Sequence, residues 1–318
     1  MQEQGDQPLT GRNRAVQLDS FGGPEVLEVR ELPAPQAGPG QVRVRVAAAG
    51  LNPMDWIMTA DADTAARFGL SLPAGFGTDY AGVVDQVGDG VIGFAPGDRV
   101  FGGALSRAVA DFVVIAPAGE IAANEAHHTP DGVDARTAAT FTIAGRTASA
   151  ALAVIDPGPE DILLIGGAAG GVGVFAVQLA RIAGARVIGT GSATSADFLR
   201  DLGADPVAYG DGLADRIRAL APGGITAAID LHGTETVHAA RELGVPDGRI
   251  ATIATQVDGV PAANGANAPL GALEEIARLA ATGRLRVPIA ASFPIEQIRS
   301  ATELQAGRRV HGKIVIDL

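Results

Sequence analysis

The hydrophobic and polar positions of this chain follow one period in its first part and another farther along. In residues 41–46, valines alternate with polar side chains, which is the period of a half-buried β-strand. Residues 83–84 and 112–115 are further short apolar stretches, and Pro/Gly turn signals such as residues 96–98 lie between them. Short strands separated by turns predict a compact barrel-like domain over residues 14–130.

Beyond this domain the pattern becomes an alternation of helices and strands. The alanine-rich residues 138–154 predict one helix. Residues 162–165 form a continuous apolar run, as expected of a parallel strand that is covered on both faces. The alternation that follows predicts a doubly wound α/β domain over residues 131–269. Residues 270–318 add two helical patterns and a closing strand.

Composition narrows the class of protein. The chain has 318 residues, of which 47% are hydrophobic, enough for the cores of two domains. No apolar run approaches the ~20 residues that a membrane helix needs. The formal net charge is −12, so the surface repels nucleic acid and anionic lipid, and neither is an expected partner. We expect a soluble cytoplasmic enzyme, with the polar residues 1–13 as a loose tail rather than a targeting signal.

Metal and thiol chemistry is restricted by the residue types present. The chain has no cysteine, which excludes disulfides, a cysteine nucleophile and cysteine-bearing zinc sites. The histidines are scattered and show no metal-ligand spacing, so each is expected on the surface or in a loop. They are His127, His128, His232, His238 and His311.

The strongest motif follows the apolar run at residues 162–165. Gly171, Gly173 and Ala176 satisfy the pattern G-x-G-x-x-(G/A) between a strand and a helix. We assign Gly171 to a tight turn, Gly173 to the approach of a pyrophosphate, and Ala176 to close helix–strand packing. A bare strand–helix turn is the alternative, but the surrounding alternation favours a dinucleotide site. Its loop consists of Ala169, Gly170, Gly171, Val172 and Gly173.

The end of the next predicted strand bears on the choice of dinucleotide. NAD-binding folds usually place a carboxylate there to hold the ribose 2′-hydroxyl, whereas this chain continues with Gly191 and Ser192. A missing carboxylate removes repulsion toward a 2′-phosphate, and Ser192 can donate a hydrogen bond to it. We therefore expect NADPH, with an ordinary loop serine as the alternative. Leu231, at the end of the strand predicted over residues 227–231, is a further expected cofactor contact.

Several segments resemble the zinc-free quinone-oxidoreductase branch of the medium-chain dehydrogenase/reductases. Residues 168–173 read Ala-Ala-Gly-Gly-Val-Gly, like the family's cofactor fingerprint. Residues 48–55 resemble its Ala-Gly-Val-Asn-Pro-x-Asp segment, and residues 77–84 resemble its Gly-x-Asp-(Phe/Tyr)-Ala-Gly-x-Val segment. Residues 97–100 and 311–315 also match. The matches run in order over nearly the whole chain and are specific for the family, although not for a substrate.

The resemblance implies a fold and an assembly. Residues 14–130 would form a GroES-like catalytic β-barrel, residues 131–269 a Rossmann domain, and residues 270–318 a segment that returns to the barrel. A homodimer is expected. Zinc-dependent relatives bind zinc through a cysteine where this chain has Asn52, and through a Gly-His-Glu histidine where residues 77–79 read Gly-Thr-Asp. We therefore expect no metal.

The resemblance also points to catalytic residues. Asn52 matches a position that faces the nicotinamide or the substrate in relatives, and its amide is suited to hydrogen-bond a carbonyl. A turn-forming asparagine before Pro53 is the alternative. Asp55 either orients Asn52 or caps the following helix. Trp56 either walls the pocket against a flat substrate or packs in the core.

Further candidates line the expected cofactor site. Thr147 matches a family threonine near the nicotinamide, and Arg146 replaces the leucine usual before it. Tyr209 resembles a family tyrosine near the adenosine phosphate. Tyr80, the other tyrosine, is expected in the core.

These features predict a reaction class. Without zinc there is no Lewis acid to polarise an alcohol or ketone, so acceptors that are already electrophilic are favoured. We expect NADPH-dependent reduction of a small-molecule quinone or α,β-unsaturated carbonyl. The alternatives are an enoyl reductase of secondary metabolism, a non-catalytic NADPH-binding protein like the crystallin relatives, and an NAD-binding regulator.

Overall fold

A computed structural model describes residues 11–117 and 124–318, and the chain divides into two compact units. Unit 1 comprises Met1–Thr129, Ser292–Ala306 and Val315–Leu318, and unit 2 comprises Pro130–Ala291 and Gly307–Ile314. Most of the predicted N-terminal tail lies outside the described residues. Its last two residues, however, belong to the first strand, so the expected loose segment is too long.

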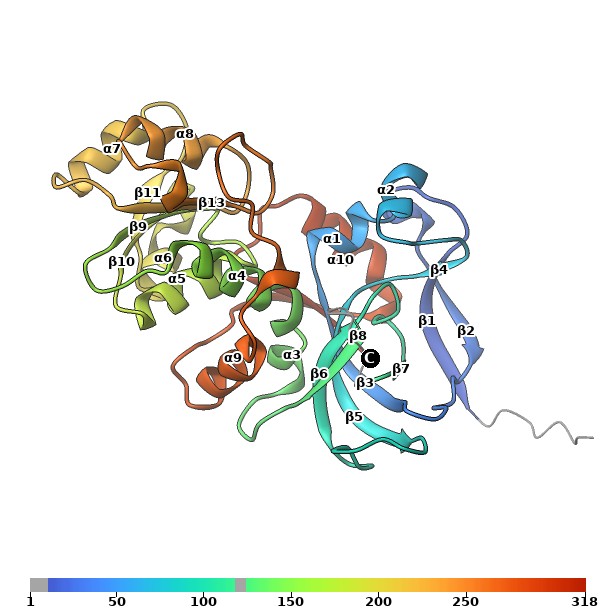
Figure 1. Cartoon of the computed structure of the whole chain (residues 1–318). Coiled ribbons are helices and arrows are strands. Elements are labelled where there is room, and N and C mark those ends of the chain that lie inside the picture. The colour runs from blue at the N-terminus through green and yellow to red at the C-terminus, as the bar shows by residue number, and fades with distance from the viewer. Residues whose placement is uncertain (1–10, 118–123) are drawn as a thin grey trace, which may run out of the picture. The chain divides into compact units, whose positions relative to one another are not determined.

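Unit 1 is built mainly from antiparallel strands (Figure 1). A three-stranded sheet has the order β2-β1-β4, and a larger sheet has the order β14-β15-β3-β5-β6-β8, with β7 paired to β3. The strands of the small sheet are β1 (Arg12–Leu18), β2 (Glu28–Pro33) and β4 (Ala74–Gly75). Those of the large sheet are β3 (Val42–Leu51), β5 (Asp79–Val87), β6 (Arg99–Ala104), β7 (Phe112–Ile115), β8 (Asn124–His128), β14 (Ile289–Pro294) and β15 (Lys313–Asp317).

The alternation that predicted β3 is explained by the core of unit 1. Val42, Val44 and Val46 are buried, whereas Arg43 and Arg45 lie on the outer face of the strand. The inward valines pack with an apolar cluster drawn from neighbouring strands. Its other buried members are Tyr80, Val84, Val100, Ala104, Ala108, Val113, Ile115 and Ala126. Three helices complete the unit: α1 (Pro53–Ile57), α2 (Ala62–Arg67) and α10 (Ile298–Ala306).

Unit 2 contains a parallel sheet of order β11-β10-β9-β12-β13, as the sequence predicted (Figure 1). Its strands are β9 (Ile162–Gly166), β10 (Arg186–Gly191), β11 (Asp205–Ala208), β12 (Ala227–Asp230) and β13 (Ile250–Thr252). One face is covered by α4 (Arg146–Ile155), α5 (Gly173–Ile182) and α6 (Ala196–Leu202), and the other by α7 (Leu213–Leu220) and α8 (Glu235–Glu242).

The order of this sheet determines where a ligand can bind. The chain runs from the central strand β9 to β10 on one side and later crosses to β12 on the other. The helices that follow β9 and β12 therefore diverge, which leaves a crevice at the carboxyl ends of these two strands.

The helix predicted over residues 138–154 is interrupted. The structure has a short α3 (Ala135–Ala138), a π-helical turn over Phe141–Gly145, and only then α4. Gly145 lies against α9 (Ala272–Ala281), where a Cβ atom would come 2.7 Å from Cδ1 of Ile276. α9 belongs to unit 2, although the sequence assigned it to a segment returning to the first domain.

No helix in the described part of the chain has the length and apolar character needed to cross a membrane.

Candidate active site and cofactor loop

The loop between β9 and α5 makes its left-handed turn at Gly167. This residue has a φ of +68°, and its carbonyl accepts a hydrogen bond from Gly170 N–H at 3.0 Å. Gly171, to which the sequence assigned the tight turn, is not among the residues with positive φ. The left-handed turn thus lies four residues before Gly171, at a glycine outside the G-x-G-x-x-(G/A) pattern.

Gly173, which the sequence assigned to the approach of a pyrophosphate, has a packing role as well. A Cβ atom on Gly173 would overlap the carbonyl group of Ala168, in the turn itself. The glycine therefore lets the first turn of α5 pack against the preceding loop. Ala176, one turn farther along, is fully buried, as expected for close packing between helix and strand.

The start of α5 offers backbone donors. Within the described part of the chain, the N–H groups of Gly171 and Val172 donate no hydrogen bond. They precede a helix of ten residues, whose N-terminus carries a partial positive charge. Unpaired N–H groups at such a terminus suit a phosphate or diphosphate. The predicted dinucleotide loop therefore has the donors that it requires.

Two other strand ends lie beside this loop. Gly167 N–H donates to Oγ1 of Thr190 at 3.1 Å, which ties the turn to the end of β10. Leu231 N–H donates to the Gly166 carbonyl at 3.2 Å, which places Leu231 on the other side of the turn. The structure thus brings the predicted residue Leu231 next to the glycine-rich loop.

The end of β10 carries no carboxylate. Oγ of Ser192 lies 2.8 Å from Oγ1 of Thr194, and the side chain is half-buried. Arg200, the first basic residue after Ser192, pairs with Asp197 at 2.6 Å.

Tyr209 follows β11 at the same edge of the sheet. Its N–H donates to the Gly191 carbonyl at 3.3 Å, and 58% of the residue is exposed. Arg216, from α7, donates to the carbonyl groups of Ala208 at 3.0 Å, Tyr209 at 3.2 Å and Gly210 at 2.8 Å. Sequence reasoning missed this guanidinium, because nothing in the pattern of α7 shows that one of its arginines turns back toward the strand.

Thr147 lies at the start of α4 in unit 2. The loop after β13 passes over it, and a Cβ atom on Gly265 would come 3.1 Å from Oγ1 of Thr147. Arg146 and Thr147 are both half-buried.

Unit 1 holds a buried polar cluster at the start of α1. Nδ2 of Asn52 lies 2.9 Å from Oδ2 of Asp79, and Asn52 N–H donates to Oδ2 of Asp55 at 2.8 Å. The hydroxyl of Thr78 donates to the other oxygen of Asp55 at 2.9 Å. All four residues are at most 2% exposed. Asp55 therefore both caps α1 and connects Asn52 with Thr78, so the two alternatives for it hold together.

This cluster has the wrong donor set for a zinc site. The Asn52 amide and the Thr78 hydroxyl are both hydrogen-bonded to carboxylates. The chain has no thiolate to offer, and no three His, Cys, Asp or Glu side chains among the described residues are grouped to hold a metal ion. Nδ2 of Asn52 also lies 3.5 Å from the Gly50 carbonyl, so its N–H groups are directed at protein acceptors.

The aromatic candidates differ in their surroundings. The indole N–H of Trp56 donates to Oε1 of Gln305 in α10, and the side chain is half-buried. Tyr80 is fully buried, as predicted, and its hydroxyl donates to the Glu125 carbonyl at 2.9 Å. Burial raises the pKa of Tyr80 well above its ordinary value, and the charge of Glu125 adds to this shift. Tyr80 is therefore a core residue rather than an acid.

Two histidines lie in a strand rather than in loops. His127 and His128 belong to β8, where they stack on Phe101 and Phe94, with ring centroids 5.4 and 4.7 Å apart. His128 is exposed, so the expectation of a surface position holds for it, whereas His127 is half-buried in the strand, which a sequence of mixed polarity did not reveal.

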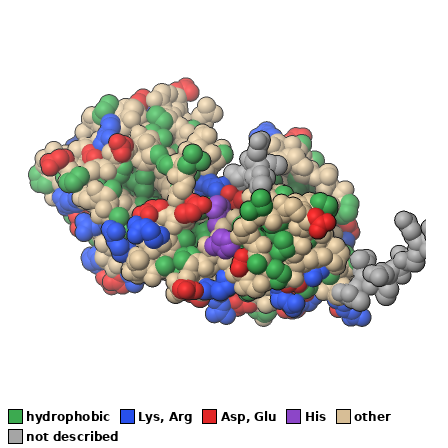
Figure 2. Space-filling view, turned by 60° about the horizontal axis from the view of Figure 1, so that its bottom comes forward, with side chains coloured by type: hydrophobic (Ala, Val, Ile, Leu, Met, Phe, Trp, Pro, Cys, Tyr) green, Lys and Arg blue, Asp and Glu red, His purple; other side chains and the backbone are tan. Residues whose placement is uncertain are grey.

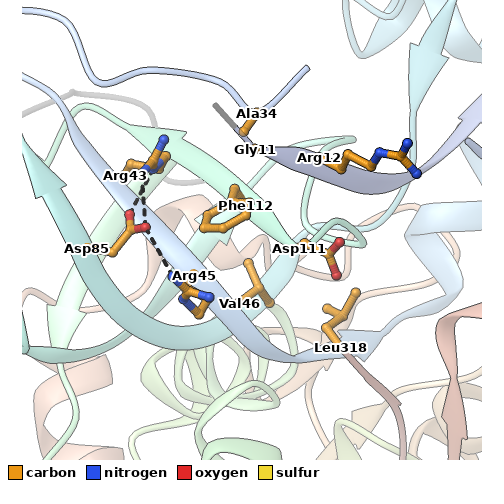
Figure 3. Close-up of a pocket in the computed structure, with 10 residues that line it drawn as sticks. All are labelled: Gly11, Arg12, Ala34, Arg43, Arg45, Val46, Asp85, Asp111, Phe112 and Leu318. Atoms are coloured by element: carbon orange, nitrogen blue, oxygen red, sulfur yellow. Dashed lines mark hydrogen bonds and ion pairs between the residues drawn. The ribbon is translucent and has the colours of Figure 1, made fainter. Parts of the chain in front are cut away.

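A hollow of about 520 Å³ lies on unit 1. Figure 3 shows Arg43 and Arg45 on either side of Asp85, with Phe112 nearby. Their guanidinium carbons lie 5.0 and 5.1 Å from the centroid of the Phe112 ring, and Asp85 accepts from Arg43 at 2.8 Å. The arginines that line this hollow are thus paired with carboxylates. The lining residues are Gly11, Arg12, Ala34, Arg43, Arg45, Val46, Asp85, Asp111, Phe112 and Leu318.

Charged side chains of both signs are interspersed over most of the face in Figure 2. The chain as a whole has a formal net charge of −12, but the face drawn carries side chains of both signs.

Comparison with known families assigns both parts of the chain. The Alcohol dehydrogenase GroES-like domain matches residues 38–125, and the family described as Zinc-binding dehydrogenase matches residues 171–276. These matches confirm the predicted combination of a GroES-like domain with a Rossmann-type domain.

Individual relatives agree with this assignment. The quinone oxidoreductase of Pseudomonas aeruginosa is 36% identical over 182 residues, which cover 56% of this chain and 52% of that protein. The chain thus spans about half the length of this relative. The spectinabilin polyketide synthase system protein NorB of Streptomyces orinoci is 34% identical over 329 residues, which cover 93% of this chain and 14% of that protein.

Solved structures cover nearly the whole chain. The quinone oxidoreductase of Coxiella burnetii has a TM-score of 0.84 at 28% identity and covers 97% of this chain and 100% of its own. Mycobacterial Rv1454c complexed with NADPH has a TM-score of 0.82 at 26% identity and covers 96% of this chain and 100% of its own. The chain belongs to the medium-chain dehydrogenase/reductase superfamily, in its quinone-oxidoreductase-like branch.

Proposed function

We propose that this protein is an NADPH-dependent reductase that transfers a hydride to a quinone or an α,β-unsaturated carbonyl without zinc. The observation that carries the proposal is that the N–H groups of Gly171 and Val172 donate no hydrogen bond within the described residues, beside a strand end that lacks a carboxylate. The relatives named as quinone oxidoreductases support the reaction class.

The residues of unit 2 would hold the dinucleotide. NADPH, when bound, supplies the hydride. The loop of Ala169, Gly170, Gly171, Val172 and Gly173 would bind its diphosphate through main-chain N–H groups. We further propose Leu231 and Thr147 as contacts toward the nicotinamide half.

The preference for NADPH rests on the edge formed by β10 and β11. Gly191 and Ser192 leave room for a 2′-phosphate without the repulsion of a carboxylate, and the Ser192 hydroxyl can donate to it. Tyr209 would cover the adenosine end, and Arg216 adds a positive charge at the turn that carries Tyr209. A structural relative complexed with NADPH supports this choice.

In unit 1 we propose Asn52, Asp55 and Trp56 as the residues that shape the acceptor site. Since the amide N–H groups of Asn52 are directed at Asp79 and Gly50, its part is to hold the polar wall in place rather than to protonate the product. Asp55 keeps Asn52 oriented through the hydrogen bond to its N–H. With this donor set the acceptor must itself be electrophilic, and water supplies the proton.

A second candidate is an enoyl reductase of secondary metabolism. It is favoured by the match to a polyketide synthase system protein over 93% of this chain. The hydride chemistry is the same, and only the acceptor differs.

The test is NADPH oxidation against a panel of quinones and enones, with NADH and with EDTA as controls. We expect turnover with NADPH that EDTA leaves unchanged, and a kcat/KM for NADPH at least about tenfold above that for NADH. Turnover of enones alone would favour the second candidate. Binding of NADPH without turnover of any acceptor would favour a non-catalytic protein and contradict the proposal.

Ser192→Asp sharpens the cofactor test. A carboxylate at this strand end should repel the 2′-phosphate and hold a ribose 2′-hydroxyl, so we expect the Kd of NADPH to rise while that of NADH is kept or falls. Ser192→Ala is the matched control, since it removes the hydroxyl without adding charge. Equal changes for both nucleotides in Ser192→Asp would contradict the placement of the 2′-phosphate here. The homodimer stays a prediction, which the molar mass in solution would decide.

A further inference from the structure

The turn between β11 and α7 is held by a single arginine side chain. Arg216, in α7, donates hydrogen bonds to the carbonyl groups of four successive residues. Its Nε donates to Ala208 at 3.0 Å, and one terminal nitrogen donates to Asp211 at 2.7 Å. The other terminal nitrogen donates to Tyr209 at 3.2 Å and to Gly210 at 2.8 Å. The planar fork of the guanidinium group makes this set of bonds possible.

The backbone of this turn contains two glycines in the left-handed conformation. Gly210 and Gly212 have φ angles of +92° and +78°, and a Cβ atom on Gly210 would meet nothing within 4 Å. Such glycines leave the chain flexible unless other groups hold it. The carboxylate of Glu235, in α8, accepts a hydrogen bond from Gly210 N–H. Side chains from α7 and α8 therefore hold the turn together.

The guanidinium group of Arg216 bonds the turn rather than a carboxylate. Arg216 is half-buried and, among the described residues, forms no ion pair. Arg218, on the same helix, is exposed and pairs with Asp215 at 2.6 Å and with Glu242 at 3.0 Å. The two arginines of α7 thus have different functions.

The orientation of Tyr209 depends on this turn. The carbonyl groups of Ala208 and Tyr209 belong to the two peptide planes on either side of the Tyr209 Cα atom. Because Arg216 bonds both carbonyl groups, it fixes the direction in which the Tyr209 side chain leaves the backbone. That side chain is exposed at the edge formed by β10 and β11, where a flat ring suits stacking against a ligand.

We propose that Arg216 is a positioning residue, which holds Tyr209 in place for contact with the adenosine of the bound nucleotide. This inference rests on the proposed function. Adenosine is common to NADPH and NADH, so Arg216 strengthens the binding of both, whereas the strand end at Ser192 governs the choice between them. The turn is open to solvent, which screens the charge of Arg216, so that its charge alone contributes little.

A double-mutant cycle on nucleotide binding, without any acceptor, tests this dependence. By calorimetry or nucleotide fluorescence, we expect Arg216→Met to raise the Kd of NADPH and of NADH by a similar factor, about threefold to thirtyfold. In a Tyr209→Ala background the same substitution should change Kd by less than about twofold, because no ring remains to be positioned. Arg218→Met is the matched control, and its Kd values should stay within about twofold of the wild type.

Two further variants separate position from charge. Arg216→Lys keeps the charge but lacks the fork that bonds four carbonyl groups, so we expect it to remain impaired. Glu235→Ala removes the second support of the turn together with a negative charge. We expect its Kd values to rise, whereas a purely electrostatic role would lower them. Recovery of affinity in Arg216→Lys, or tighter binding by Glu235→Ala, would overturn the inference.

The remaining outcomes separate this inference from folding and from the proposed function. Circular dichroism identifies the folded variants, and Glu235→Ala takes the place of Arg216→Met in the cycle if the latter does not fold. An undiminished effect of Arg216→Met in the Tyr209→Ala background would overturn the inference. So would a loss confined to NADPH, which would assign the guanidinium to the 2′-phosphate. If the wild type binds neither nucleotide, the proposed function itself fails.

Discussion

The side-chain amide of Asn52 is held 2.9 Å from the carboxylate of Asp79, and both residues are buried in unit 1. An amide next to a carboxylate is a complementary pair, in which a neutral donor meets a charged acceptor. The pair has little tolerance for a second negative charge, because neither side chain reaches solvent.

Asn52→Asp should therefore destabilise the protein strongly above neutral pH. Two buried carboxylates in contact cannot both ionise without a large cost, so we expect a loss of about 3 kcal/mol or more in the free energy of unfolding at pH 8. At pH 5 the loss should be smaller, because one raised pKa lets the pair share a proton. Thermal unfolding at the two pH values measures this difference. Asn52→Ala is the control, with a loss of about 1–3 kcal/mol that does not depend on pH in this way.

Gly173→Ala should disrupt the loop before α5. The new methyl group would overlap the Ala168 carbonyl, so the helix or the turn must move, at a cost of about 1–3 kcal/mol in unfolding free energy. Gly171→Ala is the matched control, since its methyl group would lie 3.1 Å from Cδ of the Lys313 side chain and 3.7 Å from the Gly312 carbonyl, without overlap. Denaturant unfolding of the two variants compares them. A larger loss for Gly171→Ala would show that the turn is shaped differently.

Thr142→Val should leave the protein as stable as before or more stable. Oγ1 of Thr142 is buried and, within the described residues, has no hydrogen-bond partner. A methyl group of similar size removes a desolvated polar atom at no loss of bonding. Thr140→Val is the control, because its Oγ1 donates to the Thr137 carbonyl at 2.6 Å, and we expect it to lose about 1 kcal/mol. The melting temperatures of both variants are compared with that of the wild type. An equal decrease for Thr142→Val and Thr140→Val would contradict the assignment of Thr142 Oγ1 as a hydroxyl without a partner among the described residues.

Asp161→Asn should cost stability at neutral pH but not in acid. Burial raises the pKa of Asp161, but hydrogen bonds from Thr226, Gly158 and Arg249 lower it by more, so that the net shift is downward. A lowered native pKa means stability that is present above the unfolded pKa of about 3.9 and lost as the pH falls through the native pKa. We expect a loss of about 1–2 kcal/mol at pH 7 that vanishes in acid.

The control for Asp161 is Asp247, whose partner Arg241 lies at 2.8 Å on an exposed surface. Solvent screens this pair, so Asp247→Asn should change the melting temperature little at any pH. Urea unfolding between pH 3 and 7 follows both variants. A gap between Asp161→Asn and wild type that does not narrow as the pH falls from 7 to 3 would mean that the carboxylate does not act through its charge.

The sequence predicted unit 2 better than unit 1, for a physical reason. The strands of a parallel sheet are buried on both faces, so β9 is a continuous apolar run that stands out. In unit 1, β2 has only half-buried and exposed residues, and β8 carries two adjacent histidines. Such strands are defined by their pairing partners, which periodicity along one segment does not reveal.

The structure shows where the predicted site residues lie, and several of its contacts were not indicated by the sequence. The sequence pointed to the loop around Gly171, but the left-handed turn lies at Gly167, which is outside the motif that the sequence offered. The contacts of Thr78 with Asp55 and of Lys313 with Gly171 join segments that are distant in sequence. No local pattern predicts which side chains such segments bring together.

The hydrogen bond from Gly312 to Ala169 also bears on how the protein folds. It joins parts of unit 2 that are far apart in the sequence, so it forms only after a long loop of chain has been closed. The local β-α-β elements can assemble before this contact exists. The glycine-rich turn would therefore acquire its final shape late in folding, after the elements on either side of it have formed.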